Sequence, residues 1–271
     1  EITTRLVGSE MCIRDRDHPI IAKEEDQDEA CYRQFYEEAI SLCRQKRFHE
    51  VLEKCRYTSL DDEEEYSIDV IQPEKIEFKQ NSYEDGENSI ISFPEFLLLV
   101  LDVCTGGEQP ASHYQPDKLI EKFDALKTYF TAGEFYEKML YYRLLLDYYT
   151  IRRDIKDGQG NYSLILKGPK DDSDKLKQYQ SMLYVSTEAF YNWLKPYLRK
   201  LEQDELHSCA EMLAFLKKED NERHSILPAR KDLSYKASGN IRYWFWRLDY
   251  YLWEQPVSYT HLRAHETRSN L

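Results

Sequence analysis

SFPEFLLLVL, residues 92–101, is the stretch of this sequence that decides the fold. Ser92 and Glu95 stand three residues apart, the spacing of a capping box in which each side chain accepts a hydrogen bond from the other residue's backbone. Pro94 is tolerated in the first turn, because its missing N–H would have no partner there. Six apolar residues follow, and Gly106-Gly107 ends the segment. A helix that is apolar nearly all round is normally buried, so this stretch predicts the central helix of the fold.

Apolar residues also recur at helical spacing on both sides of a second capping box, Thr131 with Glu134. Before the box the pattern opens at Pro116 and runs through Leu119, Phe123, Leu126 and Phe130; after it, through Phe135, Met139, Tyr142, Leu146 and Tyr149. Two such helices joined by a short turn predict an antiparallel helical hairpin. We expect a core that includes Phe96, Leu97, Val100, Phe123 and Leu146.

Weaker patterns outline the rest of the chain. Further helices are expected over residues 28–56, 174–185, 187–201 (kinked at Pro196), 204–218 and 239–253. Loops are expected over residues 66–89, with one short strand, and 220–236, and another short strand over 162–166. Gly and Pro are scarce, nine of each, which favours helices over a turn-rich β fold. The sequence therefore predicts a mostly α fold, a multi-helix bundle with at most a short β-hairpin.

Both ends of the chain resemble translated sequencing adaptor. Residues 1–16 read EITTRLVGSEMCIRDR, and residues 257–271 read VSYTHLRAHETRSNL. Residues 1–16 can be back-translated into a nucleotide string whose reverse complement, read one frame over, encodes residues 257–271. We therefore set aside residues 1–16 and 256–271 as adaptor-derived tails. Between them we expect an N-terminal helix and acidic loop over 17–88 and a helical domain over 89–255, both from the interior of a longer reading frame.

Composition narrows the class of protein. The formal net charge of −13 argues against this chain being the main phosphate-gripping surface of a nucleic-acid enzyme. The 22 Tyr, 11 Phe and 4 Trp need a core to bury them, which excludes a globally disordered chain. Outside the tails five cysteines are scattered with no CxxC pair, which is typical of a reducing compartment and predicts a cytoplasmic protein. No apolar run reaches membrane-spanning length, so we expect no membrane partner.

Residues that could carry chemistry are few. Asp157-Gly-Gln159 has the first letters of a nuclease nucleotide motif, but it is followed by Gly-Asn and is interpreted as a turn. The acidic run Asp61–Glu65 lacks the alternating ligands of a calcium loop and is interpreted as a solvated loop. The histidines are well separated, and none pairs with Cys or His at ligand spacing. We therefore predict no catalytic, cofactor-binding or metal-binding residue in this chain.

One modest basic cluster stands out against the acidic background. Arg152, Arg153 and Lys156 lie close together in the sequence and are candidates for contact with phosphate groups. The same three cations could instead complement the negative end of the preceding helix. The sequence leaves both interpretations open.

An aromatic block covers residues 243–253 and is a candidate base-stacking surface. At helical spacing, Trp244, Leu248 and Tyr251 share one face of the predicted helix. We favour packing of this face into the core, because aromatic side chains bury large areas. Arg247 and Asp249 are expected to tether the helix to its neighbours.

Several strings in this order resemble the helical middle region of the GmrSD-type restriction proteins. They are Ser92–Leu101, Tyr142-Arg143, Asp147-Tyr148, Ile151, Gln180–Leu183, Trp193 and Arg247–Trp253. The resemblance covers about Ser89–Trp253. It implies a parent protein with a ParB-like N-terminal domain, which uses nucleotide through an Asp-Gly-Gln-Gln-Arg motif, and a C-terminal HNH nuclease domain, which uses a divalent metal. Asp157-Gly-Gln159 lacks the second Gln and the Arg, so no catalytic residue of the family is carried over.

The resemblance therefore implies an internal piece of a bacterial modification-dependent or phage-defence DNA endonuclease. This piece would be a helical connector between the nucleotide-using and HNH nuclease domains, with no catalytic role of its own. Its partners would be the other domains of the parent and, through the parent, DNA; the nucleotide and divalent metal would be held by those domains. The alternative is a stand-alone helical module that binds another protein.

Overall fold

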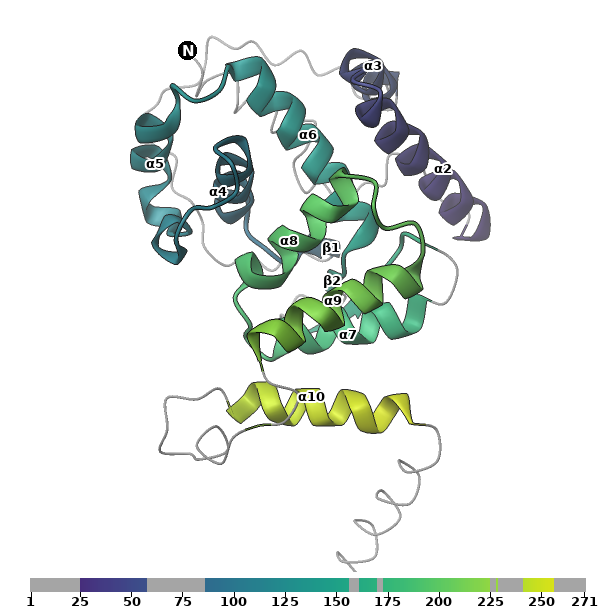
Figure 1. Cartoon of the computed structure of the whole chain (residues 1–271). Helices are drawn as coiled ribbons and strands as arrows, with labels where there is room; N and C mark the ends of the chain where they lie inside the picture. Colours follow the sequence, from purple (N-terminus) through teal and green to yellow (C-terminus); the bar gives the residue numbers. More distant parts are fainter. Residues whose placement is uncertain are drawn as a thin grey trace, which may run out of the picture.

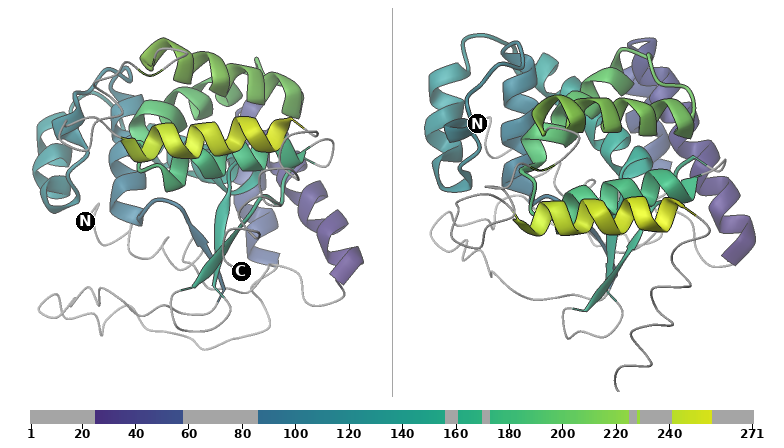
Figure 2. Two further views of the ribbon diagram at one scale, coloured as in Figure 1. Left: turned by 90° about the horizontal axis from the view of Figure 1, so that it is seen from below. Right: turned by 60° about the horizontal axis from the view of Figure 1, so that its bottom comes forward.

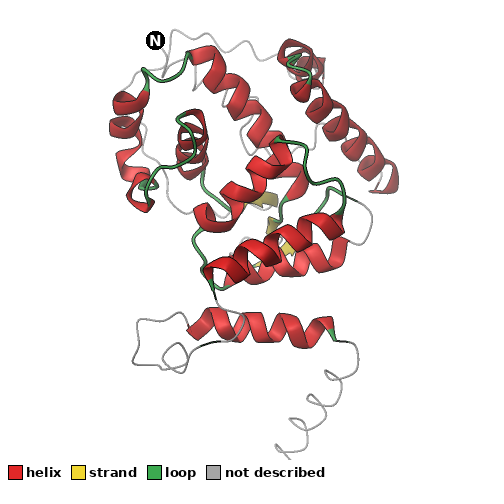
Figure 3. Ribbon diagram, viewed as in Figure 1, coloured by secondary structure: helices red, strands yellow, loops and turns green. Residues whose placement is uncertain are grey.

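The computed structural model describes residues 25–57, 86–155, 161–169, 173–224, 228 and 241–255. Several expectations fall outside these residues: the two adaptor-like tails, the acidic run Asp61–Glu65, the turn Asp157–Gln159 and Lys156. Within the described part of the chain the fold is mostly α with one small sheet, as the sequence predicts (Figure 3).

Helix α4 (Phe93–Cys104) is the central helix of the fold. Its residues from Phe96 to Asp102 are all buried, so every side of the helix contacts protein. The capping box is present: the Glu95 N–H donates to Ser92 Oγ (3.5 Å), and the Ser92 N–H donates to the Glu95 carboxylate (2.8 Å). Figure 1 shows α4 nearly along its axis, with α5 on one side and α6 on the other. The prediction of a central buried helix is confirmed.

Helix α6 (Ala132–Tyr149) begins at the second capping box, where Thr131 Oγ1 accepts from the Glu134 N–H (3.2 Å). Helix α5 (Leu119–Leu126) precedes it, after two short 3-10 turns over Ala111–His113 and Pro116–Lys118. Both α5 and α6 pack against α4. They therefore do not form the predicted hairpin along their lengths, because each finds its apolar partner on the more hydrophobic α4. Their own contact is local, the ring of Phe123 against that of Phe135, 4.9 Å between centroids.

The sheet has one strand more than the predicted hairpin. Strands β1 (Gly86–Ser89), β2 (Arg152–Ile155) and β3 (Tyr162–Ile165) are antiparallel in the order β1-β2-β3. The sequence placed one short strand in the loop over 66–89 without locating it at β1, and it did not predict β2. Strand β1 leads directly into α4 and pairs with β2, which directly follows α6. Figure 2 shows the strands projecting from one side of the helices. The sheet thus joins the entry to α4 with the exit from α6.

The last turn of α6 is enclosed by side chains and backbone from the following segments. Gln180, which is fully buried, donates from Nε2 to Tyr149 O (3.0 Å) and accepts from the Ile151 N–H (2.9 Å). Gly168 lies so close to this turn that a Cβ atom there would be 1.7 Å from Tyr148 O. These contacts fix the direction in which the chain leaves α6 and enters the sheet.

The C-terminal helices form a layer of which one member packs on α6. Helices α7 (Ser173–Val185), α8 (Phe190–Glu202) and α9 (Cys209–Arg223) form a layer in which α8 contacts α6 and α9, and α9 contacts α7. Helix α10 (Ile241–Glu254) packs on α7 at the outside of this layer (Figure 2). Pro196 lies within α8, as expected. No described helix is long and apolar enough to cross a lipid bilayer.

Several helix boundaries differ from the prediction. Helix α8 begins at Phe190 and not at 187, and α9 begins at Cys209 and not at 204, because Thr187 and Asp204 have φ values of 62° and 57° and Ser208 caps α9. The segment 28–56 is not one helix but two, α2 (Glu25–Arg44) and α3 (Phe48–Tyr57). The break falls at Lys46, whose φ of 60° ends the helix without a glycine. Helix α9 extends through Arg223, so residues 220–223 are helical where a loop was expected. The reason is Asp220, whose carboxylate faces the interior and bonds to other helices.

Candidate functional site

The predicted phosphate-contact residues that the structure describes already have partners within the protein. Arg152 and Arg153 are consecutive on β2. Arg153 donates from Nε and Nη2 to Ser89 O (3.1 and 2.8 Å), and the Arg152 guanidinium lies 4.0 Å from the Asp147 carboxylate. Lys156 lies outside the described residues. The two arginines therefore brace the strands, and their contact with phosphate stays a prediction.

Asp220 is the centre of a polar cluster between three helices. Its carboxylate is fully buried on α9 and accepts from the hydroxyls of Tyr179 on α7 (2.7 Å) and Tyr243 on α10 (2.8 Å). The Arg247 guanidinium lies 3.8 Å from the same carboxylate and donates to Tyr243 Oη (2.7 Å). Burial, with Asp220 as the second cause, raises the pKa values of both tyrosines. The tyrosines therefore stay protonated and act as hydrogen-bond donors.

Asp102, near the end of α4, is the centre of a second cluster. Its buried carboxylate accepts from the Tyr114 hydroxyl, from Lys195 Nζ on α8 (2.9 Å) and from the Gln109 N–H (2.8 Å). Lys195 also donates to Gly107 O (3.1 Å), in the turn that follows α4. This carboxylate joins the central helix to its own exit loop and to α8.

Glu202, at the end of α8, is a third carboxylate with a tyrosine and a lysine as partners, and both partners belong to α6. It accepts from the Tyr142 hydroxyl (2.6 Å) and from Lys138 Nζ. Burial is the main cause of the raised pKa of Tyr142, and the neighbouring Glu202 carboxylate is the second cause. As with Asp220, the carboxylate is used to hold two helices together. A buried tyrosine whose pKa is raised is a poor nucleophile or base at neutral pH, so these clusters favour a structural role.

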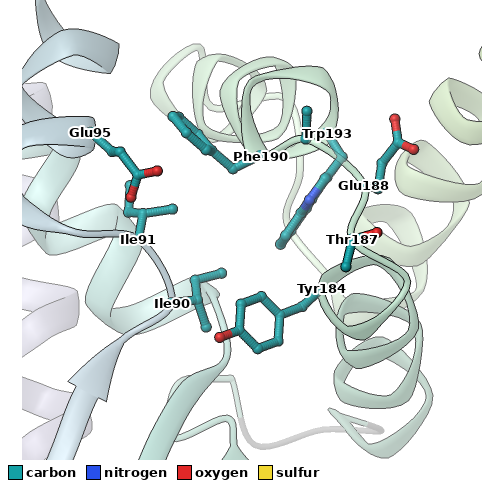
Figure 4. A pocket seen from close by; sticks show the side chains of 9 residues that line it. Ile90, Ile91, Glu95, Tyr184, Thr187, Glu188, Phe190 and Trp193 are labelled. Atoms are coloured by element: carbon teal, nitrogen blue, oxygen red, sulfur yellow. The ribbon is translucent and has the colours of Figure 1, made fainter. Parts of the chain in front are cut away.

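A pocket of about 240 Å³ lies where the turn between α7 and α8 meets the start of α4 (Figure 4). Its walls are mainly apolar, with Ile90 on one side and Trp193 on the other, and it includes two carboxylates, Glu95 and Glu188. Glu95 belongs to the capping box of α4. Two carboxylates are unfavourable neighbours for phosphate, although Glu188 is paired with His224.

Glu188 carries the main charge of this pocket. Burial tends to raise its pKa, but hydrogen bonds with His224 (3.2 Å) and Asn192 (2.9 Å) outweigh burial, and the pKa is lowered from its usual range. The carboxylate is thus ionised and already bonded to α9 and α8. Thr187, beside it, has φ of 62°, a backbone conformation that is unfavourable for a β-branched residue. Nothing in the sequence pattern singled out this pocket, because its residues come from separate segments.

The aromatic block on α10 is oriented one residue away from the prediction. The buried side chains are Tyr243, Arg247 and Tyr250, not Trp244, Leu248 and Tyr251. The reason is the Asp220 cluster, which draws Tyr243 and Arg247 inward. Arg247 is thereby confirmed as a tether. Leu248 is 55% exposed, as is Phe245.

The opposite side of α10 is apolar and turned away from α7. We call Ile241, Phe245, Leu248 and Leu252 the outer face of α10. These positions are spaced by four, three and four residues, so they form one line along the helix directly opposite the buried side chains. Trp246 and Trp253, 39% and 40% exposed, lie along one edge of it. Phe245 and Leu248 are exposed in the middle of this face, and Ile241 and Leu252 at its ends are partly exposed. An apolar surface of this kind is typical of a protein-binding site.

Among the described residues no group of three His, Cys, Asp or Glu side chains is arranged to hold a metal ion. Cys31, Cys43, Cys104 and Cys209 carry thiols that are not joined in disulfides, and burial raises the pKa of Cys104 to about 11. Comparisons with protein-family models, curated proteins and solved structures found no match to the chain. The resemblance to the GmrSD-type proteins therefore rests on the ordered strings of the sequence.

Proposed function

We propose that this chain is a non-catalytic helical connector within a bacterial DNA endonuclease of the GmrSD type. The observation that supports this role is the use of two buried carboxylates and one partly buried carboxylate. Asp102, Asp220 and Glu202 each bond to side chains from other helices, and none of the three is directed into the pocket beside α8. Such bonds hold helices in fixed relative positions, which a connector needs if it is to couple two domains.

The parent protein supplies the chemistry in this proposal. Nucleotide and divalent metal would be bound by the flanking domains, and DNA would be cut by the HNH domain. The endonuclease, its role in phage defence and its cytoplasmic location follow from the resemblance and the sequence composition. The second candidate, a stand-alone helical module that binds another protein, is favoured by one observation, the exposed outer face of α10.

Plasmid cleavage distinguishes these candidates. The chain and the complete reading frame from which it comes would be incubated with plasmid and Mg²⁺ or Mn²⁺, with and without nucleotide. We expect cleavage by the complete protein and none by this chain. Metal-dependent cutting by the chain that a single substitution such as Glu188→Gln abolishes would contradict the connector role. A complete frame without a nuclease motif would instead support the stand-alone module.

The coupling role has its own test in the complete protein. Lys195→Ala removes a bond between α8 and α4, so we expect it to reduce the stimulation of cleavage by nucleotide more than the basal cleavage. Lys218→Ala is the matched control, because the Lys218 side chain is 71% exposed and its ion pair lies within α9. Equal effects of the two substitutions on stimulation would contradict coupling through these helices.

A further inference from the structure

Helix α10 has two faces, and among the described residues its inner face is the one that packs on α7. Tyr243, Arg247 and Tyr250 are buried on the inner side. The outer face of α10 lies on the opposite side, and Figure 1 shows α10 as the outermost described helix of its layer. Apolar positions repeated at four and three residues are the pattern by which one helix packs along another. A partner helix of similar length would match this pattern.

We propose that the outer face of α10 binds the same face of a second copy of this chain, with the two helices antiparallel. Turning α10 about a two-fold axis between Trp246 and Arg247 places Ile241 opposite Leu252 of the second copy and Phe245 opposite Leu248. All four positions of the outer face are then paired. The stripe is self-complementary in this direction, which is what a two-fold interface requires.

Charged residues beside the outer face favour the same arrangement. Arg242 and Asp249 are exposed and share one edge of the stripe, seven residues apart. In an antiparallel pair that edge lies against itself, so Arg242 of each copy faces Asp249 of the other. In a parallel pair the same edge would face Trp244 and Tyr251 of the second copy, and no opposite charges would meet. Charge complementarity therefore selects the antiparallel direction.

The geometry of the molecule allows this contact. The inner and outer faces of α10 lie on opposite sides of the helix, so the two protein bodies would lie on opposite sides of the helix pair. With 14 residues, α10 is about 21 Å long. We estimate that two such helices bury roughly 1,000 Å² in total, which is at the lower end for specific interfaces. The expected dimer is therefore reversible, with a dissociation constant in the micromolar range. This inference rests on α10 and not on the proposed connector role.

Sedimentation equilibrium of the full chain tests the proposal. Between about 1 and 200 µM we expect a reversible monomer–dimer equilibrium. Leu248→Asp places a charge in the middle of the outer face and should weaken dimerisation at least about tenfold. Ile120→Asp is the matched control: Ile120 is 74% exposed on α5, and its substitution should leave the dissociation constant within about twofold of wild type.

Exchanging the charges tests the direction of the helices. Arg242→Asp and Asp249→Arg should each weaken self-association about tenfold, because like charges then face each other. The two variants mixed should associate again, because each Asp of one copy faces an Arg of the other. Circular dichroism would confirm that both stay helical. A monomer at all concentrations, larger oligomers, an equal effect of Ile120→Asp, or no association in the mixture would overturn the proposal.

Discussion

Single carboxylates at helix crossings explain why the helices hold their relative positions. Removing a charge from water costs several kcal/mol unless hydrogen bonds replace the lost hydration. Asp102 and Asp220 are both completely buried, and each accepts from a tyrosine hydroxyl and has a cationic side chain nearby. These bonds form only when the helices that carry the partners are correctly placed. Their main effect is thus on the specificity of packing.

Asp220→Ala should destabilise the protein strongly. It leaves the hydroxyls of Tyr179 and Tyr243 without their acceptor and Arg247 without its carboxylate, and breaking such a buried cluster costs about 3–5 kcal/mol. The free energy of unfolding would be measured by urea denaturation. Glu222→Ala, at an exposed position of the same helix, should change it by less than about 0.5 kcal/mol. A cost below about 1 kcal/mol for Asp220→Ala would show that the cluster is not important for stability.

The stability of the protein should fall as the pH decreases below about 6.5. Burial lowers the pKa of His113 from its ordinary value of 6.5; Lys122 and Lys195 add to this, whereas Asp102 and the bond with Leu98 O oppose it. Between the folded and ordinary pKa values the unfolded chain binds more protons. The folded protein favours the neutral imidazole of His113, and the stability that this gives is fully present above pH 6.5. As the pH falls below 6.5 this stability is lost, by at most about 1.4 kcal/mol per pH unit for one proton.

Urea denaturation between pH 5.5 and 8 would measure this dependence. His113→Gln keeps a donor for Leu98 O but cannot titrate, so its stability should vary less over this range. Glu188, whose pKa is also lowered, begins to contribute only below its ordinary value of 4.5 and does not interfere. An identical slope for wild type and His113→Gln would rule out His113 as the titrating group.

At the scale of helices and strands, local signals were sufficient where a helix begins with its own cap. Both capping boxes and the helices that follow them were predictable, because Ser92 with Glu95 and Thr131 with Glu134 act within a single turn. The short strand at 162–166 and the helix at 174–185 were also correct to within one residue. In these elements local propensity and tertiary packing agree.

Predictions failed where a distant partner decides the outcome. Helix α10 has aromatic residues on all sides, so periodicity alone could not identify its buried face. That face is chosen by Asp220, which is 23 residues from Tyr243 in the sequence and was itself expected in a loop. The pocket beside α8 could not be predicted either, because Ile90 and Trp193 meet only in the folded chain. Sequence patterns carry no direct record of such pairs.

Leu146 and Phe123, two of the positions predicted for the core, should differ in how much they contribute to the free energy of unfolding. Leu146 on α6 is 2% exposed, so Leu146→Ala should cost about 2–5 kcal/mol of unfolding free energy. Phe123 on α5 is only partly buried, and Phe123→Ala should cost less although the side chain is larger. Thermal and urea unfolding would rank the two variants. A larger loss for Phe123→Ala would mean that α5 packs more tightly than its exposure indicates.

At the scale of the whole molecule, the helices differ in how many neighbours enclose them. Helix α4 is surrounded, α6 contacts α2, α4 and α8, and α10 is applied to the outside of α7. Only three side chains of α10 are fully buried, against seven of α4. Stability is therefore expected to decrease from the centre of the molecule outward, so α10 should open more readily than α4.

Hydrogen exchange should reveal this gradient directly. In the monomer, the backbone amides of α4 should exchange more slowly than those of α10, by on the order of 100-fold or more, because α4 is released only by global unfolding. Mass spectrometry of deuterated peptides would compare the two helices, with Leu248→Asp used to keep the chain monomeric. Equal protection of α4 and α10 would mean that the protein unfolds as one cooperative unit.

The close contact at Gly168 indicates which distant sequences can share this fold. Any side chain at this position would place a carbon atom 1.7 Å from the carbonyl oxygen of Tyr148, a separation that no rotamer can relieve because both atoms belong to the backbone framework. Divergent descendants of a common ancestor can exchange most surface residues and many core residues while keeping this fold. They cannot exchange this glycine unless the chain between β3 and α7 takes another course. A distant sequence that aligns here with any other amino acid would therefore not share this arrangement.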